Sequence, residues 1–148
     1  MKTSLNLKEN PFVLLLFTTI ILLFVLSLQL ISNVDFADKV MFGIPLNNMV
    51  WTFPFFLISF WIAYLITKKY LFSKTAIWLH VLTTVVSTLL IVAILYIGIN
   101  PTQKVAANYE LVGNAIQLVT LLFIAGQFIY MANIVLGLIK RKKTQQMS

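Results

Sequence analysis

The residues able to carry chemistry are few in this chain. His80 is the single histidine, cysteine is absent, and the four acidic residues all lie outside the long apolar segments. An imidazole can serve as a general base or as a metal or haem ligand, depending on what accompanies it. Thr84 and Ser87 follow His80 by four and seven residues, so on a helix all three share one face.

A second stripe of small and polar residues lies near the C-terminus. Its members recur at helical spacing and are Gly126, Tyr130, Asn133 and Gly137, with Gln127 beside them. Small residues let two helix backbones approach closely, and amide or hydroxyl groups can hydrogen-bond between helices in a membrane. We therefore interpret the two stripes as facing surfaces of packed helices. Their polar members are Thr84, Ser87, Gln127, Tyr130 and Asn133.

A cofactor role for His80 is the alternative to this packing role. A six-coordinate membrane haem usually takes two histidines, whereas one copy of this chain supplies one, so a dimer would be required. The plainer interpretation is a hydrogen bond from the imidazole to a neighbouring group, for which Tyr70 and Asn133 are candidates. Three of the four acids, Asp35, Asp38 and Glu110, are expected on the opposite side of the membrane from His80, and no glycine-rich phosphate loop occurs. We therefore expect neither an enzymatic centre nor a metal, and no cofactor unless it is haem or a quinone.

The composition indicates an integral membrane protein. Of the 148 residues, 60% are hydrophobic and 10% are charged, against roughly 25% charged in a typical soluble domain. A bilayer core needs roughly 20 apolar residues per helical crossing. Four segments meet this requirement, at about 12–31, 49–67, 75–97 and 111–139. The predicted fold is therefore a single all-α domain over residues 1–148, a bundle of four transmembrane helices.

The connections between these segments are short, so consecutive helices should be antiparallel neighbours. Residues 32–48 carry turn-forming Asp, Asn, Gly and Pro residues. Ser73 precedes the third segment and is a candidate N-cap, because its hydroxyl could accept a hydrogen bond from an early backbone N–H. The first segment is longer than a signal-peptide core and lacks a small-residue cleavage site, so we expect it to be retained.

The basic residues predict the orientation. Two lie in the N-terminal tail, three in the middle loop and four in the C-terminal tail, whereas the other two loops carry one each. Basic loops face the cytoplasm, so both termini should be cytoplasmic and the location should be the cell membrane. The basic tail, residues 140–148, contains Lys140, Arg141, Lys142 and Lys143. We expect these four residues to contact anionic lipid headgroups, which explains the net charge of +7 without a nucleic-acid partner.

A family resemblance covers about half of the chain. The stretch "NYELVGNAIQLVTLLFIAGQFIYMANIVLGLIKRKK" resembles the last transmembrane helix of subunit I of haem–copper (cytochrome c) oxidases. The positions that carry the resemblance are Tyr109, Asn114, Gly126, Gln127, Phe128 and Asn133. "WLHVLTTVVSTLLIV" is similar to a preceding helix of that family. The family's histidine pair and copper-ligand helix have no counterpart, so the resemblance implies a ligand-less relative with the scaffold of the terminal helices.

These observations favour a multi-pass membrane protein without a catalytic centre. The absence of charged residues within the apolar segments argues against a proton pump or an ion-coupled transporter. The expected role is a structural, accessory or assembly subunit of a membrane complex, for which the resemblance suggests a respiratory oxidase. Its expected partners are the lipid bilayer and other membrane subunits or a second copy. The alternatives are a dimeric haem- or quinone-binding redox protein that uses His80 and, with less support, a small-molecule transporter.

Overall fold

The chain folds into four long helices. The computed structural model describes residues 7, 9–31, 40–41, 44–99 and 109–146. The helices are α1 (Val13–Ile31), α2 (Leu46–Thr67), α3 (Lys74–Ile99) and α4 (Tyr109–Gln146), and the 3-10 turn η1 (Lys68–Tyr70) joins α2 to α3. Their number and approximate positions confirm the predicted helical fold.

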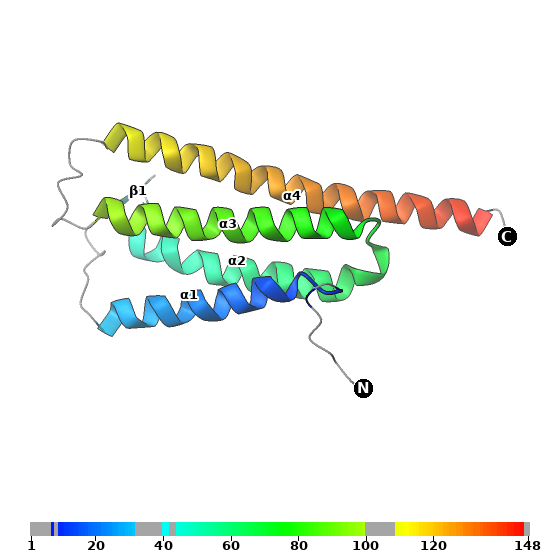
Figure 1. Cartoon of the computed structure of the whole chain (residues 1–148), viewed down its shortest axis with the longest axis horizontal. Helices are drawn as coiled ribbons and strands as arrows, with labels where there is room; N and C mark the ends of the chain where they lie inside the picture. Colours follow the sequence, from blue (N-terminus) through cyan, green and yellow to red (C-terminus); the bar gives the residue numbers. More distant parts are fainter. Residues whose placement is uncertain (1–6, 8, 32–39, 42–43, 100–108, 147–148) are drawn as a thin grey trace.

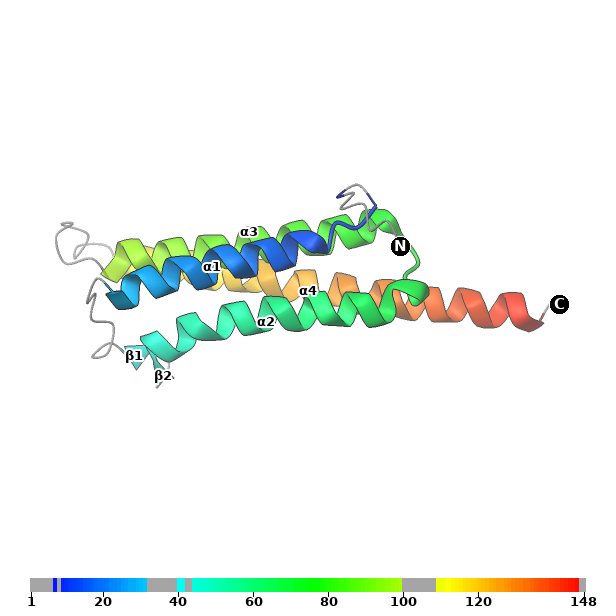
Figure 2. The ribbon, with the colours of Figure 1, turned by 90° about the horizontal axis from the view of Figure 1, so that it is seen from below.

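The four helices lie side by side and alternate in direction (Figures 1 and 2). Contacts between helices are most extensive for α3 with α4 and for α1 with α2, and α1 also contacts α3. The start of α1, the η1 turn and the end of α4 lie at one end of the molecule (Figure 1). We call this the turn end, because the short connection between α2 and α3 closes it.

The helices have the composition of membrane segments. By length and composition, three of them can cross a membrane, within Val50–Tyr70, Lys74–Leu95 and Gly113–Lys143, while the apolar stretch Val13–Leu28 of α1 is shorter. Hydroxyl groups on these helices bond to their own backbone: Ser27 Oγ donates to the carbonyl of Leu23 at 2.7 Å. Such a bond removes a polar group from an apolar surrounding that offers no partner. These features are compatible with a helical membrane protein.

Two details of the turn end follow from local sequence. Ser73 Oγ accepts a hydrogen bond from the backbone N–H of Ala76 at 3.4 Å, which confirms the predicted N-cap of α3. The helix α4 continues to Gln146, beyond its predicted end at residue 139. Lysine, arginine and glutamine favour helices, and cations suit the C-terminal end of the helix dipole. Hydropathy marks the limit of the apolar segment and not that of the helix.

A short hairpin at the opposite end was not predicted. Strands β1 (Val40–Met41) and β2 (Ile44–Pro45) pair antiparallel, with Val40 opposite Pro45 and Met41 opposite Ile44. The remaining sequence-based expectations for residues 1–6, 8, 32–39, 100–108 and 147–148 lie outside the described residues. They include the acids Asp35 and Asp38 and the basic residues Lys39 and Lys104.

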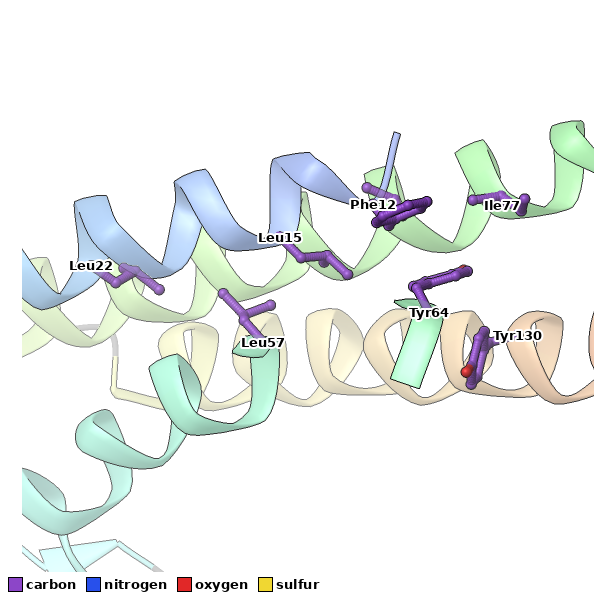
Figure 3. Packing of buried hydrophobic residues seen from close by; sticks show 8 residues of the cluster. Phe12, Leu15, Leu22, Leu57, Tyr64, Ile77 and Tyr130 are labelled. Carbon is purple, nitrogen blue, oxygen red and sulfur yellow. The ribbon is translucent and has the colours of Figure 1, made fainter. Parts of the chain in front are cut away.

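The core consists of two groups of buried side chains. The group nearer the turn end draws on all four helices and on the residue that precedes α1, and comprises Phe12, Leu15, Leu22, Leu57, Tyr64, Ile77, Val81 and Tyr130 (Figure 3). The second group comprises Leu26, Val50, Ile91, Leu95, Ile116 and Val119. The outer faces carry exposed large apolar side chains, among them Phe24, Phe55 and Phe128. Such faces suit lipid or further protein and not water.

Candidate functional site

His80 occupies the centre of a buried polar network that joins three helices. Its side chain on α3 is fully buried, and both ring nitrogens have partners. Nδ1 lies 2.8 Å from the hydroxyl of Tyr64 on α2, and Nε2 lies 3.0 Å from Oε1 of Gln127 on α4. One imidazole thus connects α2 and α4 through α3.

The amide of Gln127 determines the direction of these hydrogen bonds. Its Nε2 donates to the carbonyl of Phe123 at 2.9 Å and to Oγ1 of Thr84 at 3.2 Å. With the amide assigned in this orientation, Oε1 faces His80 and can only accept. The neutral imidazole therefore carries its proton on Nε2, while Nδ1 accepts the hydroxyl hydrogen of Tyr64. Both ring nitrogens of His80, and both the oxygen and the nitrogen of the Gln127 amide, therefore have a hydrogen-bond partner.

Aromatic rings enclose the imidazole. The ring centroids of Phe60, Tyr64 and Tyr130 lie 5.2, 5.5 and 5.1 Å from that of His80. Phe12 stacks on Tyr64 at 5.5 Å, with 13° between the rings, and Tyr130 lies on the other side (Figure 3). A metal or haem iron needs a nitrogen lone pair of the imidazole. In this arrangement Nδ1 accepts from Tyr64 and Nε2 donates to Gln127, so binding iron would require one of these partners to move.

Tyr130 makes a second link between α2 and α4. Its hydroxyl lies 3.0 Å from Oγ1 of Thr67, and the Thr67 hydroxyl donates its own hydrogen to the carbonyl of Ala63 at 2.7 Å. Because the hydrogen of Thr67 is used in that bond, Tyr130 is the donor. The two phenols near His80 therefore point to different acceptors, and together they hold α2 against both α3 and α4.

Asn133 does not belong to the His80 network. It forms hydrogen bonds to the backbone of the segment that connects α2 to α3. Its Oδ1 accepts hydrogen bonds from the backbone N–H groups of Phe72 and Ser73, at 3.1 and 2.8 Å, and its Nδ2 donates to the carbonyl of Ser73 at 3.2 Å. One turn further on, a Cβ atom added to Gly137 would overlap the backbone carbonyl of Tyr70. We call these contacts of Asn133 and Gly137 with Tyr70–Ser73 the turn clamp.

The facing of the two stripes holds for part of their length: Gly126 and Gln127 of α4 meet α3, whereas Asn133 and Gly137 meet the turn. A Cβ added to Gly126 would lie 3.2 Å from Cγ2 of Thr83, so glycine permits the close approach of the two helices. Ser87 and Thr88 are buried further along α3. The hydroxyl of Thr88 is buried without a hydrogen-bond partner among the described residues.

The structure brings together most of the residues singled out from the sequence. His80, Thr84 and Gln127 form one hydrogen-bonded group, and Tyr130 packs against the His80 ring. Asn133 and Ser87 do not join it. The expectation that Tyr70 or Asn133 would be the partner of His80 was wrong, because Tyr70 belongs to the turn and Asn133 binds that turn.

Three residues of α2 were missed by the sequence analysis. They are Phe60, Tyr64 and Thr67, which line the side of α2 that faces His80 and Tyr130. Their spacing of four and three residues is the same helical spacing that marked the stripes on α3 and α4. No individual residue of the predicted segment 49–67 was singled out from the sequence, so this third stripe was not recognised.

Basic residues gather at the turn end. Lys68 and Lys69 lie in η1, Lys74 begins α3, and Lys140, Arg141, Lys142 and Lys143 lie in the last turns of α4. Several cations rest on aromatic rings: Nζ of Lys69 is 4.9 Å and Cζ of Arg141 is 5.6 Å from the ring centroid of Tyr70. Nζ of Lys140 is 5.3 Å from that of Phe72.

The buried network is suited to packing. In the part of the chain that the structure describes, no three His, Cys, Asp or Glu side chains lie close enough together to hold a metal ion. No protein-family model, curated protein or solved structure was found to match this chain.

Proposed function

We propose that this protein is a four-pass membrane protein without a resident cofactor or catalytic centre, and that it serves as an accessory or assembly subunit of a larger membrane complex. A respiratory oxidase is the first complex to test, because of the resemblance of the C-terminal half to terminal helices of its subunit I. The proposed location is the cell membrane.

The network around His80 is the observation that carries this proposal. Its imidazole, amide and hydroxyl groups bond to one another across α2, α3 and α4. Buried polar groups that are matched in this way fix how helices pack. A bundle fixed from within can present constant outer faces to its neighbours, and those faces carry exposed apolar side chains on α1, α2, α3 and α4 alike.

Two features support the proposed topology. The 19 residues of α1 would extend about 28 Å as a helix, close to the thickness of a bilayer core of about 30 Å. This length supports α1 as the fourth crossing. The basic residues of η1, of the start of α3 and of the end of α4 share the turn end (Figure 1). The tendency of basic residues to face the cytoplasm supports placing the turn end, and with it both termini, on that side.

Mild solubilisation followed by native electrophoresis tests the proposal. Tagged full-length protein should migrate in a band of high mass together with the subunits of one membrane complex, identified by mass spectrometry, and the isolated chain should be colourless. His80→Leu should weaken the bundle without removing any absorption band. A chain that migrates only alone would contradict the accessory role. A Soret band that stays with the isolated chain and disappears in His80→Leu would instead establish the haem-binding alternative.

A further inference from the structure

Two basic segments that are distant in the sequence share one aromatic surface at the turn end. Lys69 in η1 and Arg141 in α4 both place their cationic groups over the ring of Tyr70, at 4.9 and 5.6 Å. Lys140 lies over the neighbouring ring of Phe72. We call these five residues, Lys69, Tyr70, Phe72, Lys140 and Arg141, the basic platform.

The turn clamp fixes the position of the α4 residues of the basic platform relative to its residues in and after η1. Asn133 binds the backbone at Phe72 and Ser73, and Gly137 contacts the carbonyl of Tyr70 closely. Lys140 and Arg141 follow Gly137 by three and four residues, about one helical turn, so their position over the turn depends on this contact. The spacing between the cations of η1 and those of α4 is thus a property of the fold and not of a mobile tail.

The surroundings of the basic platform combine positive charge with apolar surface. Lys68, Lys74, Lys142 and Lys143 add four further cations at this end. Among the described residues of the turn end, Glu9 is the one acidic residue, so positive charge predominates there. Ile66 and Ile139 are 67% and 58% exposed, and Phe72 is 51% exposed. A ligand that fits both features carries an anionic head and an apolar tail.

We propose that the basic platform binds the phosphate of an anionic phospholipid in the cytoplasmic leaflet. Arginine can bind phosphate oxygens through two N–H groups, and lysine adds a point charge beside it. Aromatic residues such as Tyr70 are favoured at the level of the headgroups. The exposed apolar side chains beside the platform would contact the acyl chains, which a nucleic acid or a soluble anion cannot supply. This inference rests on the proposed membrane topology and identifies a specific lipid contact within it.

Lipid binding to the isolated full-length chain in mild detergent tests the inference. The protein is titrated with phosphatidylglycerol or phosphatidylcholine, and bound lipid is counted by native mass spectrometry. Since each charge contributes about 1 kcal/mol near an anionic surface, the wild type should bind phosphatidylglycerol at least about fivefold more tightly than phosphatidylcholine. The double variant Lys69→Gln/Arg141→Gln should lose this preference. The control Lys142→Gln/Lys143→Gln, which removes the same charge, should keep most of it.

A second pair of variants tests the geometry without changing any charge. Gly137→Ala should separate α4 from the turn and lower the preference, whereas Gly113→Ala, whose added Cβ would meet nothing within 4 Å, should leave it unchanged. Circular dichroism checks that both remain helical. Equal losses from the two charge-removing pairs would show a diffuse charge effect and overturn the inference. Absence of a preference in the wild type, or full competition by inorganic phosphate, would also overturn it.

Failure of this inference is distinguishable from failure of the proposed function. The titration uses the isolated chain, so its result does not depend on whether a larger complex exists. A chain that migrates alone on native gels but prefers phosphatidylglycerol would contradict only the accessory role. A chain that joins a complex but binds both lipids equally would contradict only the lipid site.

Discussion

The hydroxyl of Tyr64 on α2 lies 2.8 Å from Nδ1 of His80 on α3, and both side chains are fully buried. Because the other ring nitrogen of His80 faces Gln127 on α4, this bond is one half of a link that passes through a single imidazole. The only histidine of the chain thereby joins three helices. Its position explains how a chain with very few polar residues in its apolar segments can still specify one packing.

The bond between Tyr64 and His80 should be measurable by a double-mutant cycle. Tyr64→Phe and His80→Leu should each destabilise the protein, and their effects should be coupled by about 0.6 kcal/mol, the average for hydrogen bonds between membrane helices, and by no more than about 1.7 kcal/mol. Unfolding by sodium dodecyl sulfate, followed by circular dichroism, gives the free energies. Tyr70→Phe is the control, because that ring lies at the turn beside Lys69. Additive effects of Tyr64→Phe and His80→Leu would contradict the bond.

The contact of Gly126 with Thr83 predicts that α3 and α4 tolerate no bulk at this position. Gly126→Leu should destabilise the protein by about 1–3 kcal/mol, because the new side chain must push the helices apart. Gly113→Leu on the same helix should cost much less, since a Cβ there meets nothing within 4 Å. Equal unfolding free energies for the two variants would show that α3 and α4 do not pack through Gly126.

Asn133 should matter for stability although it is separate from the His80 network. In Asn133→Ala the N–H of Ser73 loses its acceptor and that of Phe72 keeps only a 3.3 Å bond to the carbonyl of residue 133. The expected loss is about 1–3 kcal/mol, because these groups are partly buried. Asn114→Ala is the matched control, since Asn114 lies exposed on the same helix. A loss no greater than that of the control would exclude the clamp as a stabilising contact.

The helices could be predicted from the sequence because few secondary structures satisfy all backbone hydrogen bonds in lipid. Long apolar runs must form helices when no water is present to bond the peptide groups, and the four predicted segments match α1 to α4. The end of α4 could not be predicted in this way, because Lys140–Lys143 lie outside the apolar run but still favour a helix. The hairpin at Val40–Pro45 is too short to leave a periodic signal.

The candidate site could be predicted only in part. Helical spacing placed His80 with Thr84 on one helix and Gln127 near Tyr130 on another, and the structure joins these residues. Spacing within a helix cannot show which faces meet across the bundle. The pairing of His80 with Tyr64, and of Asn133 with the turn at Phe72 and Ser73, depends on how α2 and α4 rotate against α3, which is set by tertiary packing.

The absence of cysteine makes the topology directly measurable. Single cysteines introduced as Ser4→Cys, Lys104→Cys and Lys143→Cys can be labelled with a membrane-impermeant maleimide. In intact cells only the cysteine at position 104 should react, and all three should react after permeabilisation. This result would establish α1 as a crossing and both termini as cytoplasmic. Labelling of position 4 but not position 143 in intact cells would place the termini on opposite faces and contradict the four-pass topology.

The central claim is that the polar groups of the bundle serve packing and that the protein acts through association with other subunits. The most direct measurement is native electrophoresis of gently solubilised membranes, with an optical absorption spectrum taken on each band that contains the chain. We predict a band of high mass shared with the subunits of one complex, and no visible absorption in any band that contains the chain alone. Migration of the chain only by itself, or a pigment that remains bound to the single chain, would contradict the claim.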